Sequence, residues 1–101
     1  MRLLLFFDLP RNNTKECRQA TRFVSDLKKE GFMMLQESVY SKLLLTPSYK
    51  PLIINKLKKI KPSSGNIFVL TITEKQFADM DYLLGTKPTT QVDSTDRLII
   101  I

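Results

Sequence analysis

The chain of 101 residues contains no histidine and a single cysteine. These absences exclude zinc sites of the usual Cys/His kind, acid–base catalysis by histidine, and catalytic triads that need histidine. Glycine is also scarce, with three in the chain, and none of them stands in a Walker or dinucleotide-binding fingerprint. Any catalysis would therefore depend on carboxylates, lysine, tyrosine, serine or a hard metal ion.

Long hydrophobic runs are missing as well. No apolar stretch approaches the length of a transmembrane helix, and the first residues lack the basic leader and small-residue cleavage site of a signal peptide. We therefore expect a cytoplasmic protein with no membrane partner. The lone Cys17 cannot form an internal disulfide, and we expect it to be a reduced core residue on the apolar side of a helix.

Positive charge is abundant and unevenly distributed. The sequence has 16 Lys or Arg and 10 Asp or Glu, for a formal net charge of +6. Residues 1–61 carry 13 of the basic and 5 of the acidic side chains, whereas residues 62–101 carry 3 and 5. This gradient favours nucleic acid as the partner of the first two thirds, ahead of an acidic protein or an anionic membrane.

Hydrophobic periodicity, capping residues and turn residues predict a mixed α+β domain. Strands are expected over 2–8, 32–36, 38–45 and 66–72, and helices over 14–30 and from Thr46 to Ile60. This order is that of a ferredoxin-like βαββαβ sandwich, which we assign to residues 1–84. The strand at 66–72 is so apolar that we expect it to be central, beside the first strand, and we assign its Phe68 to the core.

The last part of the chain predicts further elements. Thr73 to Gln76 fits a capping box that opens a short helical turn, and alternating apolar residues predict an edge strand over 79–84. Residues 85–101 are expected to form a polar linker followed by a terminal strand over 97–101. Four aliphatic residues at a free C-terminus would fray without a sheet edge, and one subunit has no obvious place for them. We therefore expect the last strand to pair with a second copy in a homodimer.

Asp8 is the candidate catalytic residue. It ends the apolar run Leu3-Leu4-Leu5-Phe6-Phe7, where a strand expected to be buried on both faces emerges, and a charge is costly there. Either Asp8 caps the turn made by Pro10 and Asn12-Asn13, or it binds a cation. Because Mg²⁺ accepts one or two carboxylates together with water and substrate phosphate, two Asp8 side chains across a dimer axis would suit it.

Basic side chains from both predicted helices are the candidates for phosphate contacts. One group follows the first strand into the first helix, and the segment 50–61 adds five lysines and no acidic residue. Such contacts would bind the nucleic-acid backbone without reading its sequence, whereas a merely solvated surface is the alternative. The candidates are Arg11, Lys15, Arg18, Arg22, Lys42, Lys50, Lys56, Lys58 and Lys59.

Several ordered blocks along the whole chain resemble a known family. They are Phe7-Asp8-Leu9-Pro10, Gly31-Phe32, Gln36 to Leu43, Gly65-Asn66-Ile67, Thr71 to Phe77 and Asp96 to Ile99. In this order they resemble the CRISPR-associated Cas-two (Cas2) family, and most closely its type II-A variants.

The resemblance implies a ferredoxin-like homodimer whose final strand lies on the sheet of the partner. It further implies the small structural subunit of CRISPR spacer acquisition, a DNA-binding scaffold that bridges two dimers of the Cas-one (Cas1) integrase and supports double-stranded DNA. An alternative is also implied, because some members are described as metal-dependent endonucleases of RNA or double-stranded DNA, with the carboxylate matching Asp8 at the dimer interface. Magnesium is the cofactor expected in that case. A third possibility is a small ribonuclease or toxin outside CRISPR systems.

Overall fold

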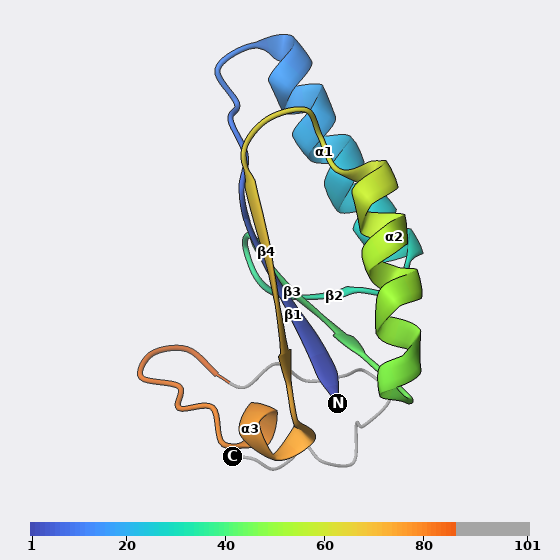
Figure 1. Cartoon of the computed structure of the whole chain (residues 1–101). Coiled ribbons are helices and arrows are strands. Elements are labelled where there is room, and N and C mark those ends of the chain that lie inside the picture. Colours follow the sequence, from blue (N-terminus) through green and yellow to red (C-terminus); the bar gives the residue numbers. More distant parts are fainter. Residues whose placement is uncertain (87–101) are drawn as a thin grey trace.

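The computed structural model describes residues 1–86 and has the expected α+β architecture. Strands β1 (Arg2–Asp8), β2 (Met33–Gln36), β3 (Val39–Leu43) and β4 (Asn66–Ile72) form one antiparallel sheet in the order β2-β3-β1-β4. Helices α1 (Thr14–Lys29) and α2 (Lys50–Ile60) cover one face of this sheet, as Figure 1 shows. This connectivity and strand order are those of the ferredoxin-like βαββαβ sandwich.

Local sequence explains where the helices begin. Asn13 caps α1, since its side-chain oxygen accepts a hydrogen bond from the Glu16 N–H at 2.8 Å, and the Glu16 carboxylate accepts one from the Asn12 N–H at 2.9 Å. A 3₁₀ turn, η1 (Pro47–Tyr49), leads into α2, whose proline lies in the first turn where its missing N–H is not needed. The predicted capping box between Thr73 and Gln76 opens the short helix α3 (Glu74–Ala78).

The core lies between the sheet and the two long helices. Because side chains alternate along a strand, Leu3, Leu5 and Phe7 of β1 all face the helices. The ring of Phe7 stacks on Tyr40 at 5.8 Å and meets Phe23 edge-on at 5.5 Å between centroids. The rest of this buried cluster consists of Leu27, Phe32, Leu44 and Leu57. Cys17 is a free thiol, as expected, but it is only half-buried.

The position of β4 corrects two expectations. It lies beside β1, as predicted, but at the edge of the sheet and not at its centre. Ile67 and Val69 pack against the core, whereas Phe68 and Leu70 lie on the face opposite the two long helices and are 66% and 52% exposed. The assignment of Phe68 to the core was therefore wrong. An apolar strand does not by itself show that both of its faces are covered within one chain.

The expected strand over 79–84 was also wrong. After α3 the chain makes a turn, in which the Met80 N–H donates to the Phe77 carbonyl oxygen at 3.3 Å, and no strand follows up to residue 86. Leu83 and Leu84 are 96% and 95% exposed. A segment with an alternating pattern forms a strand only where it can pair with the edge of a sheet. Within residues 1–86 this segment pairs with no sheet edge. The predicted terminal strand at 97–101 lies outside the described residues.

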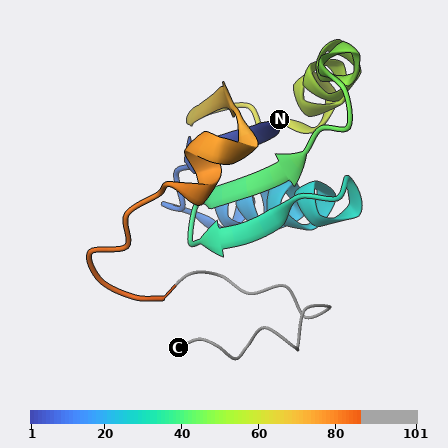
Figure 2. The same cartoon turned by 90° about the horizontal axis from the view of Figure 1, so that it is seen from below.

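An ion pair holds α3 against the start of β1. The Arg2 guanidinium donates to both carboxylate oxygens of Glu74, at 2.8 and 3.1 Å, and its central carbon lies 4.2 Å from the centroid of the Phe77 ring. Figure 2 shows α3 in this place, on the side of the sheet opposite α1 and α2. Within the part of the chain that the structure describes, no helix has both the length and the apolar character that crossing a bilayer demands.

Candidate nucleic-acid interface and acidic site

Asp8 is exposed at the end of β1, and its side chain lies on the sheet face opposite the two long helices. The alternation of β1 places it on this face together with Phe6 and Leu4, because Leu3, Leu5 and Phe7 point to the core. We call this side of the sheet the open face. Its register partner on β4 is Asn66. The sequence placed Asp8 at a strand exit correctly, but this exit is exposed, so its charge carries no burial cost.

The turn after Asp8 is packed closely by Gly65, which precedes β4. Gly65 has a φ of +106°, a conformation that favours glycine. A Cβ atom built at this position would lie 2.7 Å from the carbonyl oxygen of Asp8 and 2.8 Å from a methyl group of Leu9. The chain at 65 therefore fits only without a side chain, and this contact fixes the backbone of Asp8.

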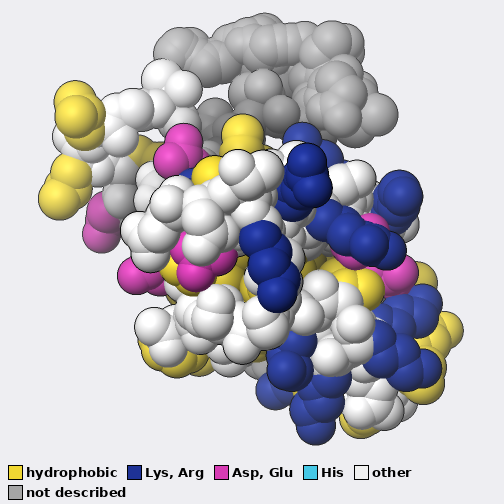
Figure 3. All heavy atoms as spheres, turned by 90° about the horizontal axis from the view of Figure 1, so that it is seen from above, with side chains coloured by type: hydrophobic (Ala, Val, Ile, Leu, Met, Phe, Trp, Pro, Cys, Tyr) yellow, Lys and Arg dark blue, Asp and Glu magenta, His cyan; other side chains and the backbone are white. Residues whose placement is uncertain are grey.

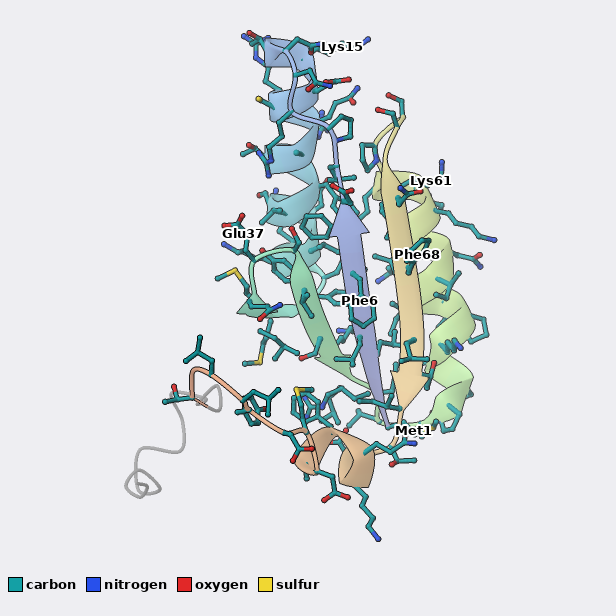
Figure 4. The ribbon with its side chains drawn as sticks, turned by 90° about the vertical axis from the view of Figure 1, so that its left-hand side faces the viewer. Met1, Phe6, Lys15, Glu37, Lys61 and Phe68 are labelled. Atoms are coloured by element: carbon teal, nitrogen blue, oxygen red, sulfur yellow. The ribbon has the colours of Figure 1, made fainter. Side chains whose placement is uncertain are left out.

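On the other side of β1 lies the turn between β2 and β3. Ser38 in this turn adopts a positive φ of 70°, and its carbonyl oxygen accepts a hydrogen bond from the Phe7 N–H at 3.1 Å. Glu37 lies in the same turn and points away from the sheet (Figure 4). Burial raises the pKa of Tyr40 above its usual 10.0, and the charge of Glu37 raises it further. Tyr40 is thus a neutral packing residue, as its stacking on Phe7 also indicates.

Asp8 does not belong to an acidic cluster among residues 1–86. In this part of the molecule, no three His, Cys, Asp or Glu side chains are grouped so that they would hold a metal ion. An exposed carboxylate with a neighbouring amide does supply the oxygen ligands that Mg²⁺ prefers. Asp8 and Asn66 thus offer two oxygen ligands of the kind that magnesium accepts, and any ion held here would take its remaining ligands from water, phosphate or a second copy of the chain.

Most of the side chains on the open face are apolar. Phe6 and Phe68 are register partners on β1 and β4, and Figure 4 shows them side by side on the face turned to the viewer. Phe68 is 66% exposed, Leu43 is 50% exposed and Met33 is 41% exposed. Several exposed apolar side chains on one face of a sheet are typical of a protein–protein contact.

The predicted basic residues lie mostly on the opposite side. Figure 3 shows Lys and Arg side chains gathered on the side of the molecule where the helices lie. A groove between α1 and the end of α2 brings together Arg22, Lys59 and Lys61, although these residues are far apart in the sequence. All of the remaining candidates except Lys42 are exposed, namely Arg11, Lys15, Arg18, Lys50, Lys56 and Lys58.

Two of the predicted basic residues already form contacts within the chain. The Lys42 ammonium is partly buried and donates to the carbonyl oxygen of Glu30 at 2.7 Å, at the C-terminal end of α1. Cations are favourable there because the last carbonyl groups of a helix lack partners. Lys56 forms an exposed ion pair with the Glu30 carboxylate at 3.3 Å. The structure thus separates Lys42 from the basic surface that the helices present to solvent.

Sequence reasoning missed the neighbours of Asp8. Pairing 2–8 with 66–72 as antiparallel strands with aligned ends would have placed Asn66 opposite Asp8, and the glycine before it would have marked a close approach. The open face was missed for a different reason. Its residues occur in the same apolar runs as the core residues, so the sequence carries no signal that separates the two.

Comparison with known proteins identifies close relatives. The family model described as CRISPR associated protein Cas2 matches residues 1–80. A protein of Streptococcus mutans serotype c, named CRISPR-associated endoribonuclease Cas2, is 46% identical over 101 residues, covering 100% of this chain and 93% of that protein. A Treponema denticola protein of the same name is 39% identical over 101 residues, with 100% of each chain covered.

A solved structure agrees with the fold. The crystal structure of Streptococcus pyogenes Cas2 at pH 6.5 matches with a TM-score of 0.64, over 82% of this chain and 99% of that one. The sequence identity in this match is 17%, so it supports the fold and nothing more specific.

Proposed function

The chain belongs to the Cas2 family of CRISPR-associated proteins, and from that premise we propose that it acts as a dimeric nucleic-acid-binding subunit of CRISPR adaptation. The observation that carries this proposal is the separation of two surfaces. An apolar open face lies on one side of the sheet, and an exposed basic surface lies over α1 and α2 on the other. The two kinds of contact, with protein and with nucleic acid, are therefore compatible in one molecule.

The open face is the proposed dimer interface. Two copies that pack these faces together bury Phe6, Phe68 and Leu70, and the edge of β4 gains a strand if the terminal residues of the partner pair with it. The same arrangement brings the two Asp8 carboxylates to the interface, because Asp8 shares the face with Phe6. Both basic surfaces then point outward, where a duplex reaches them.

The basic surface is proposed to bind the phosphate backbone of double-stranded DNA, as the scaffold that bridges Cas1 integrase dimers would have to do. Arg22 and Lys59 are the central contacts, since they line one groove and belong to different helices. We propose contacts to phosphates and none to base edges, so the affinity for DNA depends on charge and falls steeply with salt. Lys42 is left out because its ammonium caps α1.

A charge reversal tests this surface. The double variant Arg22→Glu and Lys59→Glu is expected to weaken binding of a fluorescent DNA duplex and to reduce the slope of log K against log salt by about 0.9 for each phosphate that is no longer neutralised. Fluorescence polarisation across a salt series measures both. Lys75→Glu on α3 is the control, since Lys75 is exposed on the other side of the sheet and its reversal changes the net charge half as much. A loss of binding free energy in the double variant that is only about twice the loss in Lys75→Glu would point to net charge alone and would contradict a defined surface.

A second function, cleavage of RNA or duplex DNA, is favoured by the position of Asp8. The relatives are named endoribonucleases, and Asp8 is an exposed carboxylate whose backbone packs closely against Gly65. Asp8 would hold a magnesium ion, which when bound makes a coordinated water more acidic and neutralises charge on the phosphate. The second Asp8 of the dimer would complete the acidic pair.

Asp8→Ala separates the two functions. As a nuclease, the variant is expected to lose magnesium-dependent cleavage of RNA and duplex DNA while its dimer and its duplex binding stay unchanged. As a scaffold, the same variant is expected to support spacer acquisition in cells at the wild-type level, together with unchanged binding of the Cas1 integrase. Wild-type protein that cleaves neither substrate across a magnesium and pH series would rule out the nuclease. Acquisition lost in Asp8→Ala despite intact assembly and binding would rule out a purely structural role.

A further inference from the structure

Asn66 lies directly opposite Asp8. The antiparallel ladder between β1 and β4 ends with this pair, after Phe6 opposite Phe68 and Phe7 opposite Ile67. Residues directly opposite in such a ladder project to the same face, with Cβ atoms about 4.5–5.5 Å apart. Asn66 therefore shares the open face with Asp8, and both residues are exposed.

The backbone beside this pair is fixed. Gly65, which immediately precedes Asn66, approaches the Asp8 carbonyl oxygen so closely that a Cβ atom would lie 2.7 Å from it. A cross-strand pair and a close backbone contact together define the relative position of the Asp8 and Asn66 backbones. Sites for ions and substrates are built on backbone positions that are defined in this way.

The polar atoms of the Asp8 and Asn66 side chains are also available to a ligand. Asparagine often occurs at the start of a strand because its amide satisfies the backbone of a turn. Here, among residues 1–86, neither the Asn66 amide nor the Asp8 carboxylate takes part in a side-chain hydrogen bond. Both groups therefore keep oxygen atoms available on the same face.

We propose that Asn66 is a second ligand of the cation held by Asp8, through its amide oxygen. This inference rests on the proposed magnesium site. Mg²⁺ and Mn²⁺ accept amide oxygens as well as carboxylates, and a neutral amide adds a ligand without the repulsion that another carboxylate would bring. Each chain then offers one charged and one neutral oxygen ligand, and water and substrate phosphate occupy the other positions.

Titration calorimetry with Mn²⁺ and Mg²⁺ on the full chain, without nucleic acid, tests this ligand independently of cleavage. Asn66→Ala is expected to weaken cation binding about tenfold or more. Asn66→Asp, which keeps an oxygen at the same place, is expected to bind at least as tightly as wild type. Asn55→Ala is the matched control, because Asn55 is an exposed asparagine of α2 on the far side of the sheet.

The outcomes distinguish this inference from the proposal on which it rests. If wild type binds the cation, Asp8→Ala does not, and Asn66→Ala binds as wild type does, then Asn66 is no ligand although the magnesium site stands. If wild type binds no cation, the nuclease proposal and the role of Asn66 both fail. Circular dichroism and light scattering on each variant show that the fold and the assembly are intact.

Discussion

Leu5 and Phe68 stand on neighbouring strands in similar apolar runs, yet Leu5 is fully buried and Phe68 is 66% exposed. The difference comes from the helices, because α1 and α2 cover one face of the sheet and, within residues 1–86, only the short α3 lies on the other. On the covered face, apolar residues stabilise the fold of a single chain. On the open face, residues of the same type contribute little to the fold of one chain. The comparison shows that similar strand sequences are buried on one side of the sheet and exposed on the other, where we propose that a second copy packs.

The largest expected effect belongs to the covered face. Phe23→Ala removes a ring that is 1% exposed and packs edge-on against Phe7, so the free energy of unfolding is expected to fall by about 3–5 kcal/mol. Urea denaturation followed by circular dichroism measures the decrease. Phe68→Ala removes the same ring from the open face, and for protein diluted to the monomer its effect is expected to stay within about 0.5 kcal/mol. Similar decreases in both variants would mean that the open face is packed within one chain.

The open face is tested by a pair of leucines of similar exposure. Leu70, 52% exposed on β4, lies on this face, whereas Leu52, 58% exposed on α2, lies on the helical side. Leu70→Asp is expected to convert the proposed dimer to a monomer without loss of secondary structure, because an unpaired charge is costly in an apolar interface. Leu52→Asp is expected to leave the dimer intact. Light scattering gives the mass, and a dimer that survived Leu70→Asp would place the interface elsewhere.

Sequence patterns predicted the elements well and their surroundings poorly. The helix expected from residue 14, the capping box at Thr73 and the strand ending at Asp8 depend on residues close together in the chain, and all three are present. The position of β4 at an edge and the exposure of Phe68 depend on which other elements pack beside the strand. Local sequence patterns do not contain that information.

The candidate site divides in the same way. Asp8 was identified from its place at the end of a strand, and an exposed carboxylate is there. Its neighbour Asn66 depends on strand register, and the engagement of Lys42 depends on a helix end that reaches it from another part of the chain. Composition showed how many basic residues there are, whereas only tertiary contacts show which of them already form hydrogen bonds or ion pairs within the chain.

A substitution at Lys42 tests whether this lysine contributes to the fold or to DNA binding, and we expect its effect on stability to be smaller. By register with Leu3 it lies on the covered face, where its ammonium bonds the Glu30 carbonyl oxygen. Lys42→Met keeps most of the aliphatic stem, and it is expected to lower the free energy of unfolding by about 1–2 kcal/mol while duplex binding stays unchanged. Lys58→Met, at an exposed position of α2, is expected to weaken duplex binding and to leave the free energy of unfolding nearly unchanged. If Lys42→Met weakens DNA binding as much as Lys58→Met does, the ammonium reaches DNA despite its bond to α1.

The smallest expected effect concerns α3, the one helix that residues 1–86 place on the open face. The hydrogen bonds from Arg2 lower the pKa of Glu74 below its usual 4.5, against the opposing effect of partial burial. A carboxylate with a lowered pKa stabilises the folded chain fully above its unfolded pKa, and this contribution is lost as pH falls through the folded pKa. Because Glu74 is about half exposed, solvent screening limits the contribution to at most about 1 kcal/mol. Glu74→Gln is therefore expected to be slightly less stable than wild type at pH 7.

The difference between wild type and Glu74→Gln should shrink as the pH is lowered below 4.5, since the wild-type carboxylate then takes up a proton and loses most of its attraction to Arg2. Urea denaturation at neutral and acidic pH measures it. Asp81→Asn serves as the control, because Asp81 is an exposed carboxylate with no ion pair to another residue of 1–86. A difference that did not change with pH would mean that α3 is held by the stacking of Arg2 on Phe77 and not by charge. The open face would then keep its partial cover in acid, when the ion pair is gone.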